Sequence, residues 1–157
     1  TGIANAGQSA PVIGVIVLLA MWIAFGIPVA VLSLSLYAFL PVLANTIAGL
    51  RGVDPTLIES ARGMGMTNWQ VLRQVELPLA LPIIMTGVRT ALVLLAGTAS
   101  FATFIDAGGL GALIQTGITL YRFRILVSGA LLIALLALVV EWLGRLAEVY
   151  LLSLIHI

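Results

Sequence analysis

The chain has 157 residues, of which 62% are hydrophobic and only 8% charged, and its mean hydropathy is +1.23. This composition excludes an ordinary soluble domain and is typical of a protein built from membrane-spanning helices. A net charge of +1 provides no basic field for binding nucleic acid. The chain has no cysteine and a single histidine, His156, which excludes disulfides, thiolate catalysis and Cys- or His-based metal sites.

Four apolar segments are candidates to cross the hydrocarbon layer, which takes about 20 residues. They cover residues 9–25, 28–48, 81–104 and 125–147, and the first is the shortest. Glycine and proline at positions 26 and 28 separate the first two segments, because both residues interrupt helices. We predict an all-α, polytopic transmembrane helix bundle of about four spans that begins with a transmembrane hairpin.

Both ends of the chain are predicted to differ from those of the natural protein. The chain starts at Thr1 without a signal peptide, so we expect that an N-terminal part is missing. Residues 152–157 read like a translated sequencing adapter and are treated as a possible non-native tail. The remaining residues, 1–151, are predicted to form one transmembrane domain.

The arginines set the predicted orientation. Only Arg122 and Arg124 lie between the third and fourth segments. Three others, Arg51, Arg62 and Arg73, lie between the second and third spans, and Arg145 lies at the end of the fourth. Since cytoplasmic loops are enriched in basic residues, the polar loop over about residues 51–78 is predicted to be cytoplasmic.

Two short helices are predicted within this loop. Asp54 before Pro55 is a helix start, because aspartate caps free amides and proline suits the first helical position. Thr67 and Gln70 form a capping box that opens the second helix. That helix is expected to end at Pro78. The first helix is expected to place three apolar residues on one face, and two glycines then allow a turn: Leu57, Ala61 and Met64, followed by Gly63 and Gly65.

The loop carries a spaced pattern: Glu59 and Ala61 two residues apart, Gly65 four residues later, and Leu77-Pro78 at its close. This pattern resembles the signature loop of ABC-transporter permease subunits of the binding-protein-dependent import type. Ser60 stands where the family usually has alanine, and Val75 where it usually has isoleucine. The resemblance implies that the loop docks on an ATPase subunit, and Glu59 is expected to pair there with a basic residue.

Four further stretches look like the permeases that import osmoprotectants such as glycine betaine, choline or carnitine. They are residues 61–66, 75–82, 87–91 and 107–111. The resemblance implies a multi-pass permease of the bacterial or archaeal cytoplasmic membrane, in a homodimer with cytosolic ATPase subunits and an external solute-binding protein. It also implies that ATP and magnesium are bound by the ATPase and that this chain has no cofactor. The chain is therefore expected to be a transport subunit and not an enzyme.

Other interpretations remain at this point. The solute could be methionine or another small molecule, or the protein could be a channel or structural subunit that works without an ATPase. The 51–78 loop could simply lie on the membrane surface as an amphipathic segment. Binding of DNA is disfavoured because the loop has no basic face and lies between membrane spans. An intramembrane enzyme lacks the paired aspartates or the histidine-based motifs that it would need.

Two features within the third span and after it invite interpretation. Arg89 is an ionisable residue inside an apolar segment, so it either pairs within the membrane or extends to the cytoplasmic interface. Asp106 and the glycines of residues 108–111 lack the spacing of a nucleotide-binding loop and are predicted to form a turn on the outer side. Scattered aromatic residues could contact a quaternary ammonium solute, but such scatter is also ordinary for membrane-interface belts.

Overall fold

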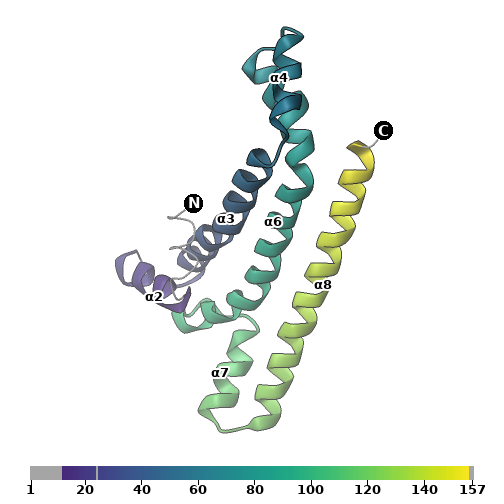
Figure 1. The fold of residues 1–157 in the computed structure, drawn as a ribbon. Helices are drawn as coiled ribbons and strands as arrows, with labels where there is room; N and C mark the ends of the chain where they lie inside the picture. The colour runs from purple at the N-terminus through teal and green to yellow at the C-terminus, as the bar shows by residue number, and fades with distance from the viewer. Residues whose placement is uncertain (1–11, 24, 156–157) are drawn as a thin grey trace.

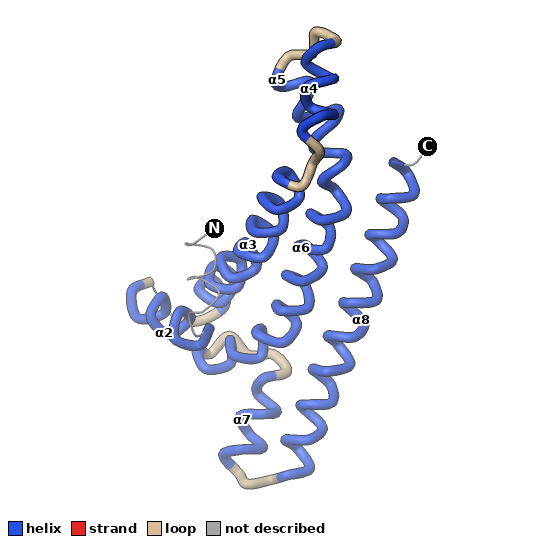
Figure 2. Tube along the Cα trace, viewed as in Figure 1, coloured by secondary structure: helices blue, strands red, loops and turns tan. Residues whose placement is uncertain are grey.

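The computed structural model describes residues 12–23 and 25–155, and every regular element in that part of the chain is helical (Figure 2). The α-helices are α2 (Val12–Trp22), α3 (Ile27–Arg51), α4 (Pro55–Gly63), α5 (Asn68–Val71), α6 (Leu77–Thr98), α7 (Gly111–Thr119) and α8 (Phe123–Ile155). A π-helical turn, Leu72–Glu76, joins α5 to α6, and a 3₁₀ helix, Ala99–Ile105, follows α6.

Three helical runs among the described residues are long and apolar enough to cross a membrane. They are α3, the continuous run Asn68–Ile105 and the part of α8 over Phe123–Tyr150. The 25 residues of α3 extend about 37 Å at 1.5 Å per residue, which exceeds the ~30 Å of a bilayer core. The second, third and fourth predicted spans are thus confirmed, although the third begins earlier than expected and the fourth runs on beyond it.

Only part of the first predicted span, residues 9–25, is described. In that part the structure has the apolar helix α2, whose 11 residues reach about 16 Å, less than the thickness of a bilayer core. Residues 9–11 and 24 lie outside the described residues. The predicted break before α3 is confirmed, because Gly26 has a φ of 113° and proline occupies the first turn of α3.

A small apolar core holds α2 against the start of α3 and the 3₁₀ helix. Its buried members come from α2, α3 and the 3₁₀ helix: Ile16, Ala20, Val29, Ala30, Ala102 and Ile105. The amide of Gly26 donates to the carbonyl oxygen of Ile105 at 2.8 Å. This bond ties the start of α3 to the end of the 3₁₀ helix, so both lie at the same level.

Glycines allow α3 and α6 to approach closely. A Cβ at Gly87 of α6 would lie 2.6 Å from the Cβ of Asn45 in α3, and one at Gly49 would lie 3.0 Å from the carbonyl oxygen of Ala80. Since small residues are what lets membrane helices pack backbone to backbone, these two positions fix the distance between α3 and α6.

Glycines also bring α7 against α8. A Cβ at Gly117 would lie 2.6 Å from the backbone nitrogen of Leu126, and one at Gly129 would lie 2.9 Å from the Cβ of Leu113. The turn predicted after Asp106 is confirmed as the connection into α7. Figure 1 shows α4 at one end of the molecule and the α7–α8 hairpin at the other. The described part of α8 includes residues 152–155, whereas His156 and Ile157 lie outside the described residues.

Candidate functional site

The 51–78 loop begins with a capped helix. The Oδ1 of Asp54 accepts a hydrogen bond from the backbone amide of Thr56 at 2.9 Å, and Pro55 occupies the first turn of α4. Both parts of the predicted helix start are confirmed. The amide and hydroxyl of Thr56 stabilise the ionised carboxylate and lower the pKa of Asp54. The negative charge of Asp54 is also stabilised by the positive end of the helix dipole at the N-terminus of α4.

Ala61 is the residue of the signature pattern that faces inward. It is 2% exposed, and Val71 of α5 is 1% exposed. The helix α4 contacts both α5 and the π-helical turn, so a small side chain at position 61 allows the two short helices to lie together. Leu57 and Met64, predicted to share a face with Ala61, are instead 47% and 75% exposed. Of the three residues predicted to share a face, only Ala61 is buried.

Gly65 ends α4 in a Schellman turn. The amide of Met66 donates to the carbonyl oxygen of Ala61 at 3.2 Å, and the amide of Gly65 donates to that of Arg62 at 2.9 Å. This pattern requires a left-handed residue, and Gly65 has a φ of 85°. A Cβ at Gly65 would meet nothing within 4 Å, so its glycine is required by backbone conformation and not by space. Gly63 is the last residue of α4 and has no such requirement.

The second helix starts with the predicted capping box. The amide of Thr67 donates to the Oε1 of Gln70 at 2.8 Å, and the amide of Gln70 donates to the Oγ1 of Thr67 at 3.4 Å. The reciprocal bonds fix the direction in which the chain leaves the Gly65 turn.

Pro78 does not end this helix, so the predicted stop is wrong. In the π-helical turn before it, the amide of Leu77 donates to the carbonyl oxygen of Leu72, five residues back. A π-helical turn shifts the hydrogen-bond register by one residue, so a proline without an amide is accommodated in the first turn of α6. As a result the loop continues into the membrane as one helical run, Asn68–Ile105.

The remaining pattern residues fall into two groups. Glu59 and Ser60 are exposed on α4, and the Ser60 hydroxyl donates to the carbonyl oxygen of Thr56 at 2.7 Å. Val75, Leu77 and Pro78 lie where the π-helical turn meets α6, half-buried or, for Leu77, 37% exposed. The structure therefore places the outward-facing carboxylate on α4 and the closing residues at the base of the loop.

The loop that carries Glu59 also has exposed apolar side chains, which the sequence pattern did not identify as site residues. Besides Leu57 and Met64, Trp69 is 66% exposed. A cavity of about 220 Å³ opens beside Leu57, between the end of α3, the start of α4 and the first turns of α6. Large apolar side chains on a polar, membrane-external loop are a feature of protein–protein contact surfaces. Only their exposure marks these side chains as site residues, and that exposure depends on how α4 packs on α5.

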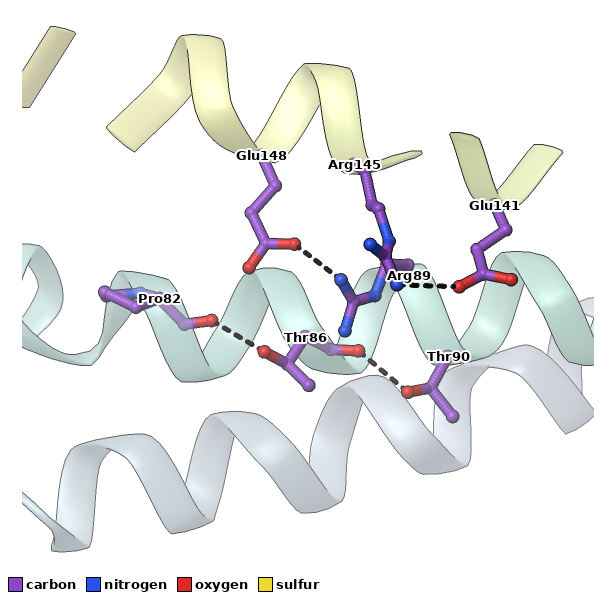
Figure 3. A network of polar contacts seen from close by, with 7 residues as sticks. All are labelled: Pro82, Thr86, Arg89, Thr90, Glu141, Arg145 and Glu148. Carbon is purple, nitrogen blue, oxygen red and sulfur yellow. Dashed lines mark hydrogen bonds and ion pairs between the residues drawn. The ribbon is translucent and has the colours of Figure 1, made fainter. Parts of the chain in front are cut away.

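Arg89 pairs within the helix bundle. Its Nη1 lies 3.2 Å from the Oε2 of Glu148 on α8, with the two side chains 31% and 18% exposed (Figure 3). A Cβ at Gly144 would lie 3.4 Å from the Cγ of Arg89, so this glycine leaves room for the arginine stem. Of the two sequence interpretations of Arg89, the structure has the ion pair. The sequence-based prediction did not name Glu148 as the partner of Arg89. A signal was present, because α8 has two carboxylates, Glu141 and Glu148, and Arg145 can neutralise only one of them.

A second ion pair lies beside the first. On α8, the Nη2 of Arg145 lies 3.4 Å from the Oε1 of Glu141, one helical turn away. Figure 3 shows both pairs in the space between α6 and α8. The four charges cancel, as is expected of ionisable groups within membrane helices. The Arg89–Glu148 pair thus joins α6, which continues from the 51–78 loop, to α8.

Comparisons with known proteins agree with the pattern in the 51–78 loop. The family described as "Binding-protein-dependent transport system inner membrane component" matches residues 1–148. The carnitine transport permease protein OpuCB of Listeria monocytogenes is 43% identical over 146 residues, which cover 92% of this chain and 67% of that protein. The osmoprotectant import permease protein OsmW of Salmonella typhimurium is 48% identical over 118 residues, covering 75% of this chain and 55% of that protein.

Solved structures share the fold as well. A chain of the MetNI methionine ABC transporter in an inward-facing conformation superposes with a TM-score of 0.82 at 26% identity, covering 94% of this chain and 71% of that chain. The chain spans about two thirds of the length of the first curated relatives. With a family match over residues 1–148, the chain belongs to the binding-protein-dependent transport system inner membrane components, the permease subunits of ABC importers.

Proposed function

We propose that this chain forms the translocation path of an ATP-driven importer for a small osmoprotectant such as glycine betaine, choline or carnitine. The observation that carries this proposal is the capped, glycine-ended α4 with its exposed carboxylate, in a chain whose relatives are named for carnitine and osmoprotectant transport. Names of relatives supply the solute class, and the loop supplies the coupling role.

The 51–78 loop is the surface that meets the cytosolic ATPase. Glu59 offers a carboxylate for an arginine or lysine of the ATPase, and the exposed Leu57, Met64 and Trp69 offer apolar contact area around it. The Asp54 cap, the Gly65 turn and the Thr67–Gln70 box hold α4 and α5 as one rigid body. ATP and magnesium bind to the ATPase and not to this chain.

Motion passes from the loop into the membrane through α6. Because α5, the π-helical turn, α6 and the 3₁₀ helix form one helical run of 38 residues, displacement of α4 and α5 by the ATPase moves α6. The Arg89–Glu148 pair then transmits the displacement to α8. Alternating access would follow from rocking of these helices in a permease homodimer that receives solute from an external binding protein.

Methionine import is the second candidate, because the MetNI methionine transporter has the same fold. A channel that functions without an ATPase is a third interpretation, and it assigns no role to the exposed carboxylate of Glu59. These alternatives make opposite predictions for solute choice and for dependence on ATP.

Uptake by the complete permease, reconstituted with its ATPase and binding protein in proteoliposomes, tests the proposal. We expect ATP-dependent uptake of labelled glycine betaine, carnitine or choline, and none of methionine. Glu59→Lys is expected to abolish uptake and solute-stimulated ATP hydrolysis, because it places a like charge against the ATPase. Gln74→Lys, a new positive charge at another exposed position of the loop, is the matched control and should leave both intact.

The outcomes separate the interpretations. Uptake of methionine alone would leave the importer and change the solute. Undiminished uptake by Glu59→Lys would overturn the coupling role of the loop. Uptake that proceeds without ATP would favour the channel.

A further inference from the structure

The polar side chains in the middle of α6 lie together on one face of that helix. Thr86, Arg89 and Thr90 fall within about a third of the helix circumference, at about 3.6 residues per turn. On the opposite face, positions 84 and 88 are the apolar Ile84 and Val88. This part of α6 therefore has one polar side and one apolar side within a membrane-spanning run.

The charged residues of α8 also share one face. Glu141, Arg145 and Glu148 recur at helical spacing, and all three belong to the membrane-spanning part of α8, Phe123–Tyr150. This face meets the polar side of α6, because Glu148 lies 3.2 Å from Arg89 (Figure 3). Ionisable groups inside membrane spans are costly, and they line the water-filled cavities and paths of transport proteins. We therefore expect this side of α6 and α8 to be hydrated.

A cavity of about 300 Å³ opens between the two polar faces. Arg89 and Thr90 of α6 line it together with Glu141 of α8, and the rest of its lining is the apolar pair Val93 and Leu94. Its volume is at the lower end of the range for small-molecule sites. The cavity thus offers one cationic group, one anionic group and an apolar surface. A small solute that carries both a negative and a positive charge matches this lining.

Both charged groups of the cavity keep free bonding capacity. A guanidinium has several N–H donors, and among the described residues Arg89 uses one of them, on Glu148. The Arg89 side chain is 31% exposed, so its other donors are accessible. Glu141 holds Arg145 through one oxygen at 3.4 Å, in an exposed pair within one helix that contributes little. A ligand can therefore bind both groups without breaking the Arg89–Glu148 pair.

We propose that this cavity is a transient binding site for a zwitterionic solute on the translocation path, with the solute carboxylate on Arg89 and its cationic group against Glu141. The assignment rests on the proposed function and deepens it. Glycine betaine and carnitine have a carboxylate, which can accept paired bonds from a guanidinium, whereas choline has none. Arg89 is therefore a specificity-determining residue. None of the described residues that line the cavity is aromatic, so charge alone holds the ammonium group. Binding is weak enough for release, as a path requires.

Thiol labelling of the complete permease, bound to its ATPase in nanodiscs, tests the site directly. The chain has no cysteine, so Thr90→Cys places a single thiol of the permease in the cavity. A water-soluble methanethiosulfonate attacks the thiolate, which forms only where water reaches it. We expect the thiol to react, and glycine betaine to slow the reaction at least threefold. Val88→Cys, on the apolar side of α6, is the matched control and should not react.

Charge variants in the Thr90→Cys background assign the two ends of the solute. Glu141→Gln should raise the concentration of glycine betaine that gives half protection at least fivefold, whereas Glu141→Asp keeps the carboxylate and should change it less than twofold. Arg89→Gln combined with Glu148→Gln removes the cation without leaving a lone carboxylate. This double variant should weaken protection by glycine betaine at least fivefold and leave protection by choline unchanged.

Three results would overturn the site. The first is a thiol at position 90 that does not react, and the second is a thiol that reacts equally with and without glycine betaine. The third is an equal loss of protection by glycine betaine and choline in the double variant, because a merely structural role of Arg89 affects both solutes alike. A reactive thiol at position 88 would refute the hydrated side of α6 and the site with it.

Uptake by the unmodified importer distinguishes these failures from failure of the proposed function. ATP-dependent uptake of glycine betaine without protection of the thiol would refute the cavity site and leave the importer intact. Methionine is also a zwitterion. If methionine is taken up and protects the thiol while glycine betaine does neither, the osmoprotectant function is overturned and the zwitterion site is supported.

Discussion

The 51–78 loop and the α7–α8 hairpin both end a helix with a left-handed residue, but the residue differs. Each ends a helix in a Schellman turn, with one amide bonded five residues back and the preceding amide bonded three residues back. In the loop the left-handed position is Gly65, with a φ of 85°, whereas in the hairpin it is Tyr121, with a φ of 52°. Both turns require a left-handed residue, so the two regions differ in whether that residue carries a side chain.

A third turn of the same kind supports this interpretation. At the end of the 3₁₀ helix, the amides of Ala107 and Asp106 donate to the carbonyls of Ala102 and Thr103, and Asp106 has a φ of 62°. A left-handed L-residue costs about 1–2 kcal/mol, less for aspartate. Glycine is used in the turn of the 51–78 loop, and residues with side chains are used at the other two turns. Site-directed changes can test whether this contrast is real.

The largest expected effect concerns the ion pair between Arg89 of α6, the helix that continues from the loop, and Glu148 of α8. Glu148→Ala should lower the free energy of unfolding by about 2 kcal/mol, less than for a fully buried pair, because water reaches part of Arg89. Thermal unfolding in detergent measures it. Replacing both Arg89 and Glu148 by methionine should recover most of the loss, which a double-mutant cycle would quantify. Glu141→Ala breaks the exposed pair with Arg145 and should cost no more than about 0.5 kcal/mol.

The next effect distinguishes the two glycines of the loop. Gly65→Ala should destabilise α4 by about 1–2 kcal/mol, since alanine is strained at positive φ. Gly63→Ala should leave α4 unchanged or stabilise it by up to about 1 kcal/mol, because alanine favours the helix. Hydrogen exchange of the amides of α4 reports both. Equal effects would mean that the turn at Gly65 does not depend on its conformation. Gly65→Asn should be tolerated best among the larger residues.

The smallest effect has the opposite sign. Asp106→Gly should raise the free energy of unfolding by up to about 1 kcal/mol, because the strain of the left-handed aspartate exceeds the extra chain entropy of glycine. Thermal unfolding of the variant beside the unmodified protein measures the shift. A loss of stability would show that the aspartate side chain supports the turn, and the contrast with Gly65 would then be weaker.

Local features of the site followed from the sequence, because they depend on residues within one helical turn. The Asp54 cap, the Thr67–Gln70 box and the turn at Gly65 all involve partners two to five residues apart. The prediction that the helix ends at Pro78 was wrong for a related reason, because it also rested on local residues alone. Proline usually stops a helix, and nothing in the neighbouring residues announced the π-helical turn that accommodates it.

Amino-acid sequence alone determined the membrane class, three of the spans and the resemblance to importer permeases, since hydropathy and motif spacing are properties of the chain itself. Tertiary structure decided which residues meet. It paired Arg89 with Glu148, 59 positions away, buried Ala61 while leaving Met64 and Trp69 exposed, and set α7 on α8 through Gly117. These outcomes depend on close approach between separate helices, and the distance between two helices is set by shapes that no local pattern contains.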